Sequence, residues 1–147
     1  MKKQVIFLAA LMCMIIHSVT ALADDRIIPV SQLPETARKF VEATFPGQTI
    51  SYAKIDKDLF SKSYEVRLDN GFEIEFDKNG TWKKVNCKHS AVPAGIIPAS
   101  IAEYVKSSFP GTQITKIDKK RSGYEVELSN DLDLKFNSSG KFLGIDD

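Results

Sequence analysis

The stretch LPETARKFVEATFPGQTI, residues 33–50, decides the fold because it occurs twice. Its copy, IPASIAEYVKSSFPGTQI, covers residues 97–114 at a constant offset of 64. A second block, residues 64–80, repeats in residues 124–140 at an offset of 60, so the second copy has lost four residues just before its tyrosine. Self-similarity of this length indicates a duplicated structural unit. We therefore predict two copies of one fold, the second with a shortened hairpin.

Each copy opens with a predicted helix. Mostly apolar residues recur at helical spacing on one side of each predicted helix, and charged residues occupy the other side. The first copy has Leu33, Ala37, Phe40, Val41, Thr44 and Phe45 in this set, and the second has Ile97, Ile101, Tyr104, Val105 and Phe109. Pro34 is tolerated because it lies in the first turn. The Phe-Pro-Gly sequence at residues 45–47 ends the helix, since proline cannot continue it.

The residues after each helix alternate between apolar and charged with period two, which is typical of strands with one buried face. Residues 64–68 and 72–76 alternate in this way, and Asp69-Asn70-Gly71 between them predicts a hairpin. The predicted fold class is α+β, with each copy a helix laid on an antiparallel four-stranded meander. A unit of about 60 residues is marginal alone. We therefore expect one shared antiparallel sheet of about eight strands, with both helices on one face.

The chain divides into three parts. Residues 1–23 combine a basic start, a short apolar run and a small-residue exit, which predicts a cleaved signal peptide rather than a membrane span. Cys13 lies in that run, but Met12 before it is not the small residue that lipoprotein processing needs. Residues 24–87 and 88–147 are then the two repeats. We expect a periplasmic or secreted protein with no stable membrane insertion after signal cleavage.

The charge of the exported part disfavours two classes of partner. Loss of residues 1–23 removes Lys2 and Lys3, so 20 basic residues become 18 against 19 acidic ones, a net charge of −1. Nucleic acids and anionic membrane surfaces attract a clustered basic excess, which this chain does not have. We expect no nucleic-acid partner. Cys87 is then the only cysteine, so packing rather than an internal disulfide must hold the fold.

The sequence FDKNGTW, residues 76–82, has two interpretations. An acid, an amide and a glycine in a row form half of a calcium loop or a plain tight turn. The equivalent stretch, FNSSGKF at residues 136–142, keeps the glycine and the flanking aromatics but has no carboxylate. We therefore favour a turn with a left-handed glycine, and we expect no metal site.

Catalytic chemistry has little support in the sequence. Cys87 and His89 bring a thiol near an imidazole, but two ligands do not build a zinc site. His89 is also the only histidine after residue 23, and no serine sits in a nucleophile-elbow pattern. We expect no enzymatic activity and no cofactor. We expect Cys87 at the frayed, peripheral end of a strand that enters a connector at residues 88–95. At such a position Cys87 could form a disulfide with another chain.

One sheet surface is the candidate binding site. Strict alternation places positions 83 and 85, and their equivalents 143 and 145, on the core face, so both aromatic side chains before them point to the opposite, charged face. An aromatic in each copy on a charged sheet face is typical of a protein-binding surface. The alternative is that a bulge reverses the alternation and both rings belong to the core. The candidate partner-binding residues are Trp82, Phe142, Tyr52, Glu73, Glu75, Glu127 and Lys135.

The doubled pattern Leu-Pro-x10-Phe-Pro-Gly, then Tyr-Glu-Val, then Phe-Asp-x-x-Gly-x-Trp resembles the PepSY-like family of exported bacterial proteins, also described as beta-lactamase-inhibitor-like. The resemblance covers the chain from about Val30 to its end. It implies a tandem helix-plus-four-strand architecture, a periplasmic setting and no assigned catalysis. Related PepSY modules are described as restraining peptidases, and beta-lactamase inhibitor protein binds an enzyme through its open sheet face. These roles come by fold analogy only.

Two functions from different classes follow. The first is a non-enzymatic binding module that presents the open sheet face, with Trp82, Phe142 and Tyr52 as anchors, to an exported protein such as a peptidase. The second is a sensor or carrier of a small ligand or peptide bound between the two repeats. If the two rings are exposed, the double variant Trp82→Ala with Phe142→Ala should abolish binding and leave folding nearly intact. If the two rings are buried, the same double variant should unfold.

Overall fold

The computed structural model describes residues 24–146, and the predicted signal segment lies outside the described residues. The strands are β1 (Asp24–Ile28), β2 (Ile50–Lys57), β3 (Lys62–Leu68), β4 (Glu73–Asp77), β5 (Trp82–Asn86), β6 (Ile114–Lys120), β7 (Gly123–Leu128), β8 (Asp133–Asn137) and β9 (Phe142–Asp146). The helices are α1 (Glu35–Thr44) and α2 (Ala99–Ser108), each preceded by a short 3-10 helix, η1 (Val30–Gln32) and η2 (Ala94–Ile96). The predicted α+β class is confirmed.

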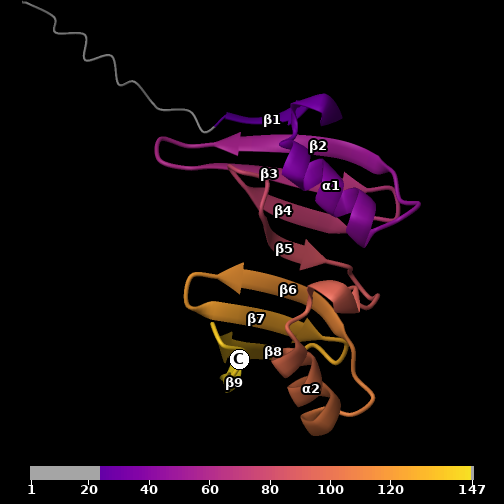
Figure 1. Cartoon of the computed structure of the whole chain (residues 1–147), viewed down its shortest axis with the longest axis vertical. Coiled ribbons are helices and arrows are strands. Elements are labelled where there is room, and N and C mark those ends of the chain that lie inside the picture. The colour runs from indigo at the N-terminus through magenta and orange to yellow at the C-terminus, as the bar shows by residue number, and fades with distance from the viewer. Residues whose placement is uncertain (1–23, 147) are drawn as a thin grey trace, which may run out of the picture.

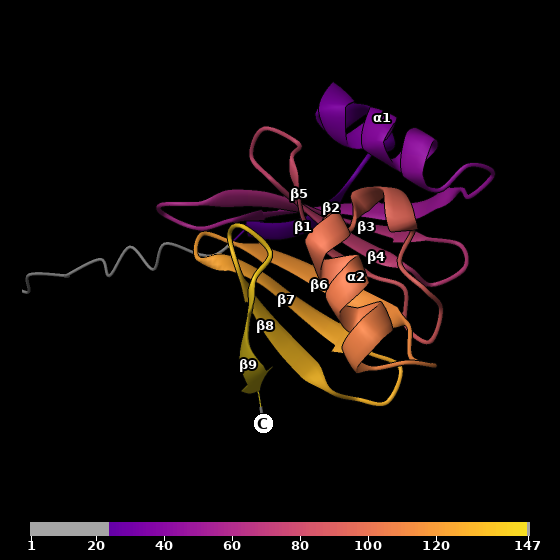
Figure 2. The ribbon, with the colours of Figure 1, turned by 60° about the horizontal axis from the view of Figure 1, so that its bottom comes forward.

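The strands form one antiparallel sheet in which neighbours in sequence are neighbours in space, from β1 at one edge to β9 at the other (Figure 1). Figure 2 shows both helices on the same face of this sheet, as expected. The sheet has nine strands rather than about eight, because β1 pairs with β2 and places Ile28 opposite Ala53. Only Ile28 of this strand is buried, so β1 has no alternating pattern that the sequence could reveal.

Both helices begin and end as the sequence predicts. Pro34 is the N-cap residue of α1, and Pro98 holds the same position in α2. At the other end the N–H of Phe45 donates to the Val41 carbonyl at 2.9 Å, and Gly47 then adopts a φ of +79°. A positive φ of this size is costly for residues with a side chain, so glycine suits the turn after α1, where the Gln48 N–H donates to the Phe45 carbonyl at 3.1 Å.

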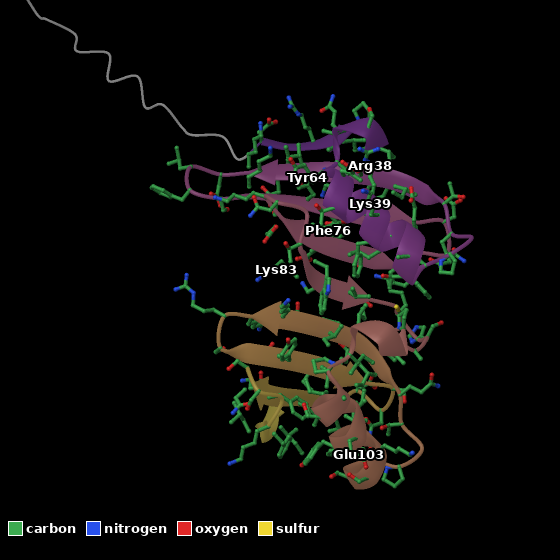
Figure 3. The ribbon with its side chains drawn as sticks, in the orientation of Figure 1. Arg38, Lys39, Tyr64, Phe76, Lys83 and Glu103 are labelled. Atoms are coloured by element: carbon green, nitrogen blue, oxygen red, sulfur yellow. The ribbon has the colours of Figure 1, made fainter. Side chains whose placement is uncertain are left out.

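The core lies between the helices and the sheet. In each repeat one phenylalanine of the third meander strand is fully enclosed under the helix, Phe76 in the first and Phe136 in the second. Burial of such a side chain contributes about 1.5–3 kcal/mol. Phe76 meets Phe40 of α1 edge-on at 5.7 Å, and Phe136 meets Tyr104 of α2 at 5.6 Å (Figure 3 labels Phe76). The two repeats therefore build the same core by the same aromatic contact.

A β-bulge at the start of β5 and of β9 sets the direction of the two aromatic side chains. Phe76 pairs with Trp82 and Glu75 pairs with Lys84, so Lys83 is an extra residue that breaks the alternation. Trp82 consequently shares the helix-covered face with Val85. Its ring stacks on Phe40 of α1 at 6.1 Å between centroids.

The second repeat has the same bulge. Phe136 pairs with Phe142 and Lys135 pairs with Gly144. Phe142 stacks on Tyr104 of α2 at 4.5 Å. The expectation that Trp82 and Phe142 face away from the helices is therefore wrong, and the bulge alternative is correct. Positions 83 and 143, expected on the core face, are the exposed extra residues.

Cys87 is also placed differently from the expectation. It is fully buried rather than peripheral, and burial raises the pKa of its thiol to about 11. Its backbone N–H donates to the Thr115 carbonyl of β6 at 2.9 Å. The Val92 N–H donates in turn to the Ile114 carbonyl at 2.8 Å. The connector therefore lies against β6, and the buried thiol is unsuited to an intermolecular disulfide.

The two repeats join through β5 and β6. Their antiparallel ladder pairs Lys84 with Asp118, Val85 with Ile117 and Asn86 with Lys116. Val85 and Ile117 are both fully buried on the helix-covered face. The join is thus a short piece of ordinary antiparallel sheet, and the helix-free face continues across it without interruption.

Candidate protein-binding face

The sheet face opposite the helices, here called the open face, carries charged side chains in rows that cross the strands. The central row has one residue from every strand, since each member pairs directly with the next. In order from β1 to β9 it consists of Ile27, Lys54, Glu65, Glu75, Lys84, Asp118, Glu125, Lys135 and Gly144. The row beside it, here called the second row, consists from β2 to β9 of Tyr52, Arg67, Glu73, Asn86, Lys116, Glu127, Asp133 and Asp146. Period two in the sequence produces both rows, because alternate residues of a strand share a face.

An acid-base-acid group occupies the centre of the open face, where the repeats join. The Lys84 ammonium nitrogen lies 3.0 Å from a carboxylate oxygen of Glu75 and 3.9 Å from one of Asp118. Only 18% of the Asp118 side chain is exposed, and burial raises its pKa in spite of the nearby lysines. Burial lowers the pKa of Lys84, but the hydrogen bond to Glu75 and the charge of Asp118 outweigh it, so this pKa lies above its usual value. The group is therefore partly desolvated and held in place.

The second row holds an arginine between an aromatic ring and an acid. The Arg67 guanidinium lies over the Tyr52 ring at 5.8 Å and forms an ion pair with Glu73. Lys88 also pairs with Glu73, at 2.7 Å. The Tyr52 hydroxyl donates to a carboxylate oxygen of Glu65 at 3.4 Å. This arrangement fixes an aromatic and an arginine on a sheet surface, two residue types that are enriched at the energetic centres of protein interfaces.

Five of the seven predicted binding residues lie on the open face. They are Tyr52, Glu73, Glu75, Glu127 and Lys135. Glu127 pairs with Lys116 at 3.4 Å, and Lys135 pairs with Asp146 at 2.8 Å. The other two, Trp82 and Phe142, lie under the helices.

Lys84, Lys116 and Asp118 are among the residues of the open face that escaped the sequence reasoning. Lys84 did so because the bulge shifts the alternation by one residue. Lys116 and Asp118 did so because β6 was not assigned a register, although its own alternation with Ile117 carries the signal.

The turn at residues 77–81 uses its acidic residue to hold the backbone. One carboxylate oxygen of Asp77 accepts the N–H groups of Asn79 at 2.9 Å and Thr81 at 3.0 Å. The amide oxygen of Asn137 makes the corresponding pair of bonds to Ser139 and Lys141 in the second repeat. An amide thus does the same work as a carboxylate, which fits the plain-turn interpretation. Residues 24–146 contain no group of three or more His, Cys, Asp or Glu side chains placed to hold a metal ion.

A polar cavity of about 250 Å³ lies where the connector meets the second repeat. Thr115, buried at its wall, donates its hydroxyl to the Glu127 carbonyl at 3.2 Å. The cavity is lined by Asn86, Lys88, His89, Thr115, Glu127, Leu128, Ser129 and Asp131. Its lining includes residues of both repeats, since Asn86 ends the first and the others belong to the connector and the second.

These features define a class of protein: a duplicated helix-on-sheet module with one face of its sheet open and lined with ordered charge. Residues 23–74 and 62–144 each match the family described as "Putative beta-lactamase-inhibitor-like, PepSY-like", and the chain belongs to this family. The two matches agree with two repeats. None of the curated proteins matches this chain.

Three solved structures of Bacteroides proteins are similar to this chain. A "putative calcium-regulated periplasmic protein" from Bacteroides thetaiotaomicron is 42% identical with a TM-score of 0.81, over 84% of this chain and 98% of that one. A "putative periplasmic protein" from Bacteroides vulgatus is 43% identical with a TM-score of 0.80, over 84% and 98% of the two chains. Another from Bacteroides vulgatus, described as of unknown function, is 38% identical with a TM-score of 0.81, over 84% and 99%. Within residues 24–146, neither helix has the length and apolar character to cross a membrane.

Proposed function

We propose that this protein is a non-enzymatic periplasmic binding module that holds an exported protein against its open face. One observation carries the proposal: the face opposite the helices displays charged side chains in two rows across the strands, and at its centre the group of Glu75, Lys84 and Asp118 is partly desolvated. The description of the similar structures as periplasmic supports the location.

The charges of the open face favour specific rather than general binding. Both signs occur in each row, and most acids already have a basic neighbour, as in the pair of Lys116 with Glu127. Fixed charges of mixed sign select a partner with the complementary pattern and reject others, because a misplaced like charge costs several kcal/mol. Tyr52 with Arg67 above its ring gives this surface one amphipathic anchor.

The family supports an enzyme as the partner. Beta-lactamase-inhibitor-like proteins give the module its name, and related PepSY modules are described as restraining peptidases, so we infer an exported peptidase or similar enzyme as the bound protein. This step rests on fold analogy.

A photo-cross-linking residue at position 52 tests the proposal in the native cell envelope. We expect one reproducible cross-linked protein from position 52 and none from position 103, because Glu103 is exposed on α2, on the opposite side of the molecule (Figure 3). Identical products from both positions, or no product from position 52, would contradict the open face as the binding surface.

A matched pair of charge exchanges then tests the chemistry of the surface. Glu75→Lys with Lys84→Glu and Asp118→Lys keeps both ion pairs of the central group but reverses the pattern that a partner meets. Glu35→Lys with Lys39→Glu makes the same exchange in an exposed pair on α1, where the two groups lie 2.6 Å apart. We expect the first exchange to remove the position-52 cross-link and the second to leave it. Equal cross-linking in both variants would show that the central row takes no part.

The polar cavity supports a second candidate function, a carrier or sensor of a small polar ligand. Its lining has the basic side chains Lys88 and His89 of the connector and the acidic side chains Glu127 and Asp131 of the second repeat. Native mass spectrometry of protein purified from the cell envelope, compared with Lys88→Ala, tests this candidate. An added mass that the variant loses would support it, and an unliganded native protein would count against it.

A further inference from the structure

We propose that the outer edge of β9 pairs with the β9 edge of a second copy of this chain and so forms a two-fold dimer. Within residues 24–146 no strand pairs with this edge, and β9 ends the sheet opposite β1 (Figure 1). An unpaired strand edge presents a row of free N–H and C=O groups that favours strand addition. The inference concerns the edge of the sheet rather than its open face, so it stands independently of the proposed function.

The first repeat shows how a strand pairs at this position. At the offset of 60 that relates the two meanders, Gly144, Ile145 and Asp146 correspond to Lys84, Val85 and Asn86. Those three residues of β5 are the ones that pair with β6. The bulge that precedes them occurs in β9 as well, so it does not prevent pairing. The edge of β5 is therefore paired with β6, whereas the equivalent edge of β9 is unpaired within residues 24–146.

The backbone of β9 is oriented for this contact. In β5 the Cys87 N–H donates to the Thr115 carbonyl of β6. Because backbone groups point alternately to the two sides of a strand, Val85, two residues earlier, also directs its N–H and C=O toward β6. Ile145 holds the position of Val85 in the second repeat. Its N–H and C=O consequently point outward, away from β8.

The side chains of β9 show what a neighbour would cover. Val85 is fully buried opposite Ile117, whereas Ile145 in the same position is 49% exposed. Leu143, the extra residue of the bulge, is exposed as well. Large aliphatic side chains on an unpaired edge are the feature that soluble proteins usually suppress with charge or proline. An added strand would bury Ile145 as β6 buries Val85.

A second copy fits this edge because the edge is complementary to itself. Antiparallel pairing about a two-fold axis at Ile145 sets Ile145 opposite its own counterpart, which repeats the aliphatic pair of Val85 and Ile117. The same register sets Gly144 opposite Asp146 of the other copy, so no two like charges meet on the open face. The two-fold axis also closes the assembly at two chains, whereas pairing of β9 with β1 would continue without limit.

The dimer is expected to be weak. Stable interfaces bury about 800 Å² on each partner. A single five-residue strand contributes less than this, so the dimer should form in proportion to concentration and exchange rapidly. Concentration dependence is therefore the property to measure.

Sedimentation equilibrium of the purified protein, from micromolar to millimolar concentration, tests the dimer. We expect the average mass to rise from that of one mature chain toward twice that value. Ile145→Lys should keep the protein monomeric throughout, and Ile145→Pro should do the same, since proline removes an N–H that the fold itself does not use. Ile27→Lys is the matched control, because Ile27 is 71% exposed on the other edge strand, and it should dimerise normally. A monomer at every concentration, or loss of the dimer in Ile27→Lys, would overturn the proposal.

A cysteine at position 145 tests the register. Directly opposed Cα atoms in such a pair lie about 5.5 Å apart, a distance that a disulfide spans. Ile145→Cys should therefore give a disulfide-linked dimer under mild oxidation, many times faster than Ile27→Cys at equal concentration. The buried thiol of Cys87 should contribute no product. Equal rates from positions 145 and 27 would show random collision instead of strand pairing.

Discussion

The last strands of the two repeats, β5 and β9, have the same bulge and the same pairing to the strand before them, yet they differ in burial. Val85 is enclosed because β6 lies beside it, and Ile145 is half exposed because nothing in the described chain occupies the corresponding place. The difference comes from the neighbour and not from the residue. A duplicated fold can thus show, within one chain, what a strand looks like with and without its partner.

The open faces of the two repeats differ in a second way. The helix side repeats its chemistry, as in Phe76 and Phe136, while the central row changes sign at equivalent positions. The pairs that differ in sign are Lys54 with Asp118 and Glu75 with Lys135. Packing under a helix restricts what the core accepts, whereas a solvent-facing strand position accepts any charge. The fold is therefore symmetric and the candidate binding surface is not.

The largest expected effect is on stability when the stacked aromatic of each repeat is removed. Trp82→Ala and Phe142→Ala should each destabilise the protein by about 2–4 kcal/mol, because each deletes a half-buried ring and leaves space beneath a helix. Trp82→Ala should cost more, since its ring lies on an interior strand with Lys119 of β6 over it at 5.4 Å. Urea unfolding measures both. Full stability of either variant would place that ring outside the core.

The direction of these two rings shows where sequence reasoning ends. The duplication, the helices, the hairpins and the fold class follow from offsets and periods, because they rest on many residues at once. The bulge depends on one extra residue, and alternation alone cannot place it. A signal was present: Trp82 to Val85 and Phe142 to Ile145 are both apolar spacings of three, which strict alternation does not produce.

The next largest effect concerns the glycine of each turn. A Cβ at Gly80 would lie 2.7 Å from Pro34 Cβ and 2.9 Å from the Ala37 backbone nitrogen, at a φ of +83°. A Cβ at Gly140 would meet the Ser100 hydroxyl, which can rotate away. We expect Gly80→Ala to cost about 2–3 kcal/mol and Gly140→Ala about 1 kcal/mol.

A third variant separates the two causes of this glycine effect. Ser100→Ala removes the hydroxyl that a Cβ at Gly140 would meet. Thermal unfolding should show that Ser100→Ala reduces the cost of Gly140→Ala, leaving the backbone penalty of a positive φ and the contact with the Cβ of residue 100 at 3.1 Å. Equal costs with and without this change would attribute the whole effect to backbone strain.

A smaller effect tests the charge at the centre of the open face. Asp118 has a raised pKa, so the folded state binds its proton more tightly than the unfolded state does. Its contribution to stability therefore increases as the pH falls from above its folded pKa toward 3.8, its ordinary value, and is lost as the pH rises. Relative to Asp118→Asn, the wild-type melting temperature should rise across this fall in pH. A change of opposite sign would show that the attraction of Lys84 outweighs burial.

The open face itself was only partly predictable. Glu73, Glu75 and Glu127 were placed on it by period two, a local property that survives any arrangement of the strands. The contact between Lys84 and Asp118 could not be predicted, because residues 34 apart become neighbours only when β5 pairs with β6 in one particular register. Register across a connector is set by the packing of both repeats, and no short stretch of sequence contains it.

The smallest expected effect is the exchange of the turn residues between repeats. Asp77→Asn and Asn137→Asp should each change the melting temperature by less than about 2 °C, because either side chain supplies one oxygen that accepts two backbone N–H groups. Asp77→Ala and Asn137→Ala remove both bonds and should each cost about 1 kcal/mol or more. If Asp77→Asn proved as costly as Asp77→Ala, the negative charge itself would be needed in the first repeat, and the two turns would differ in function despite their equal geometry.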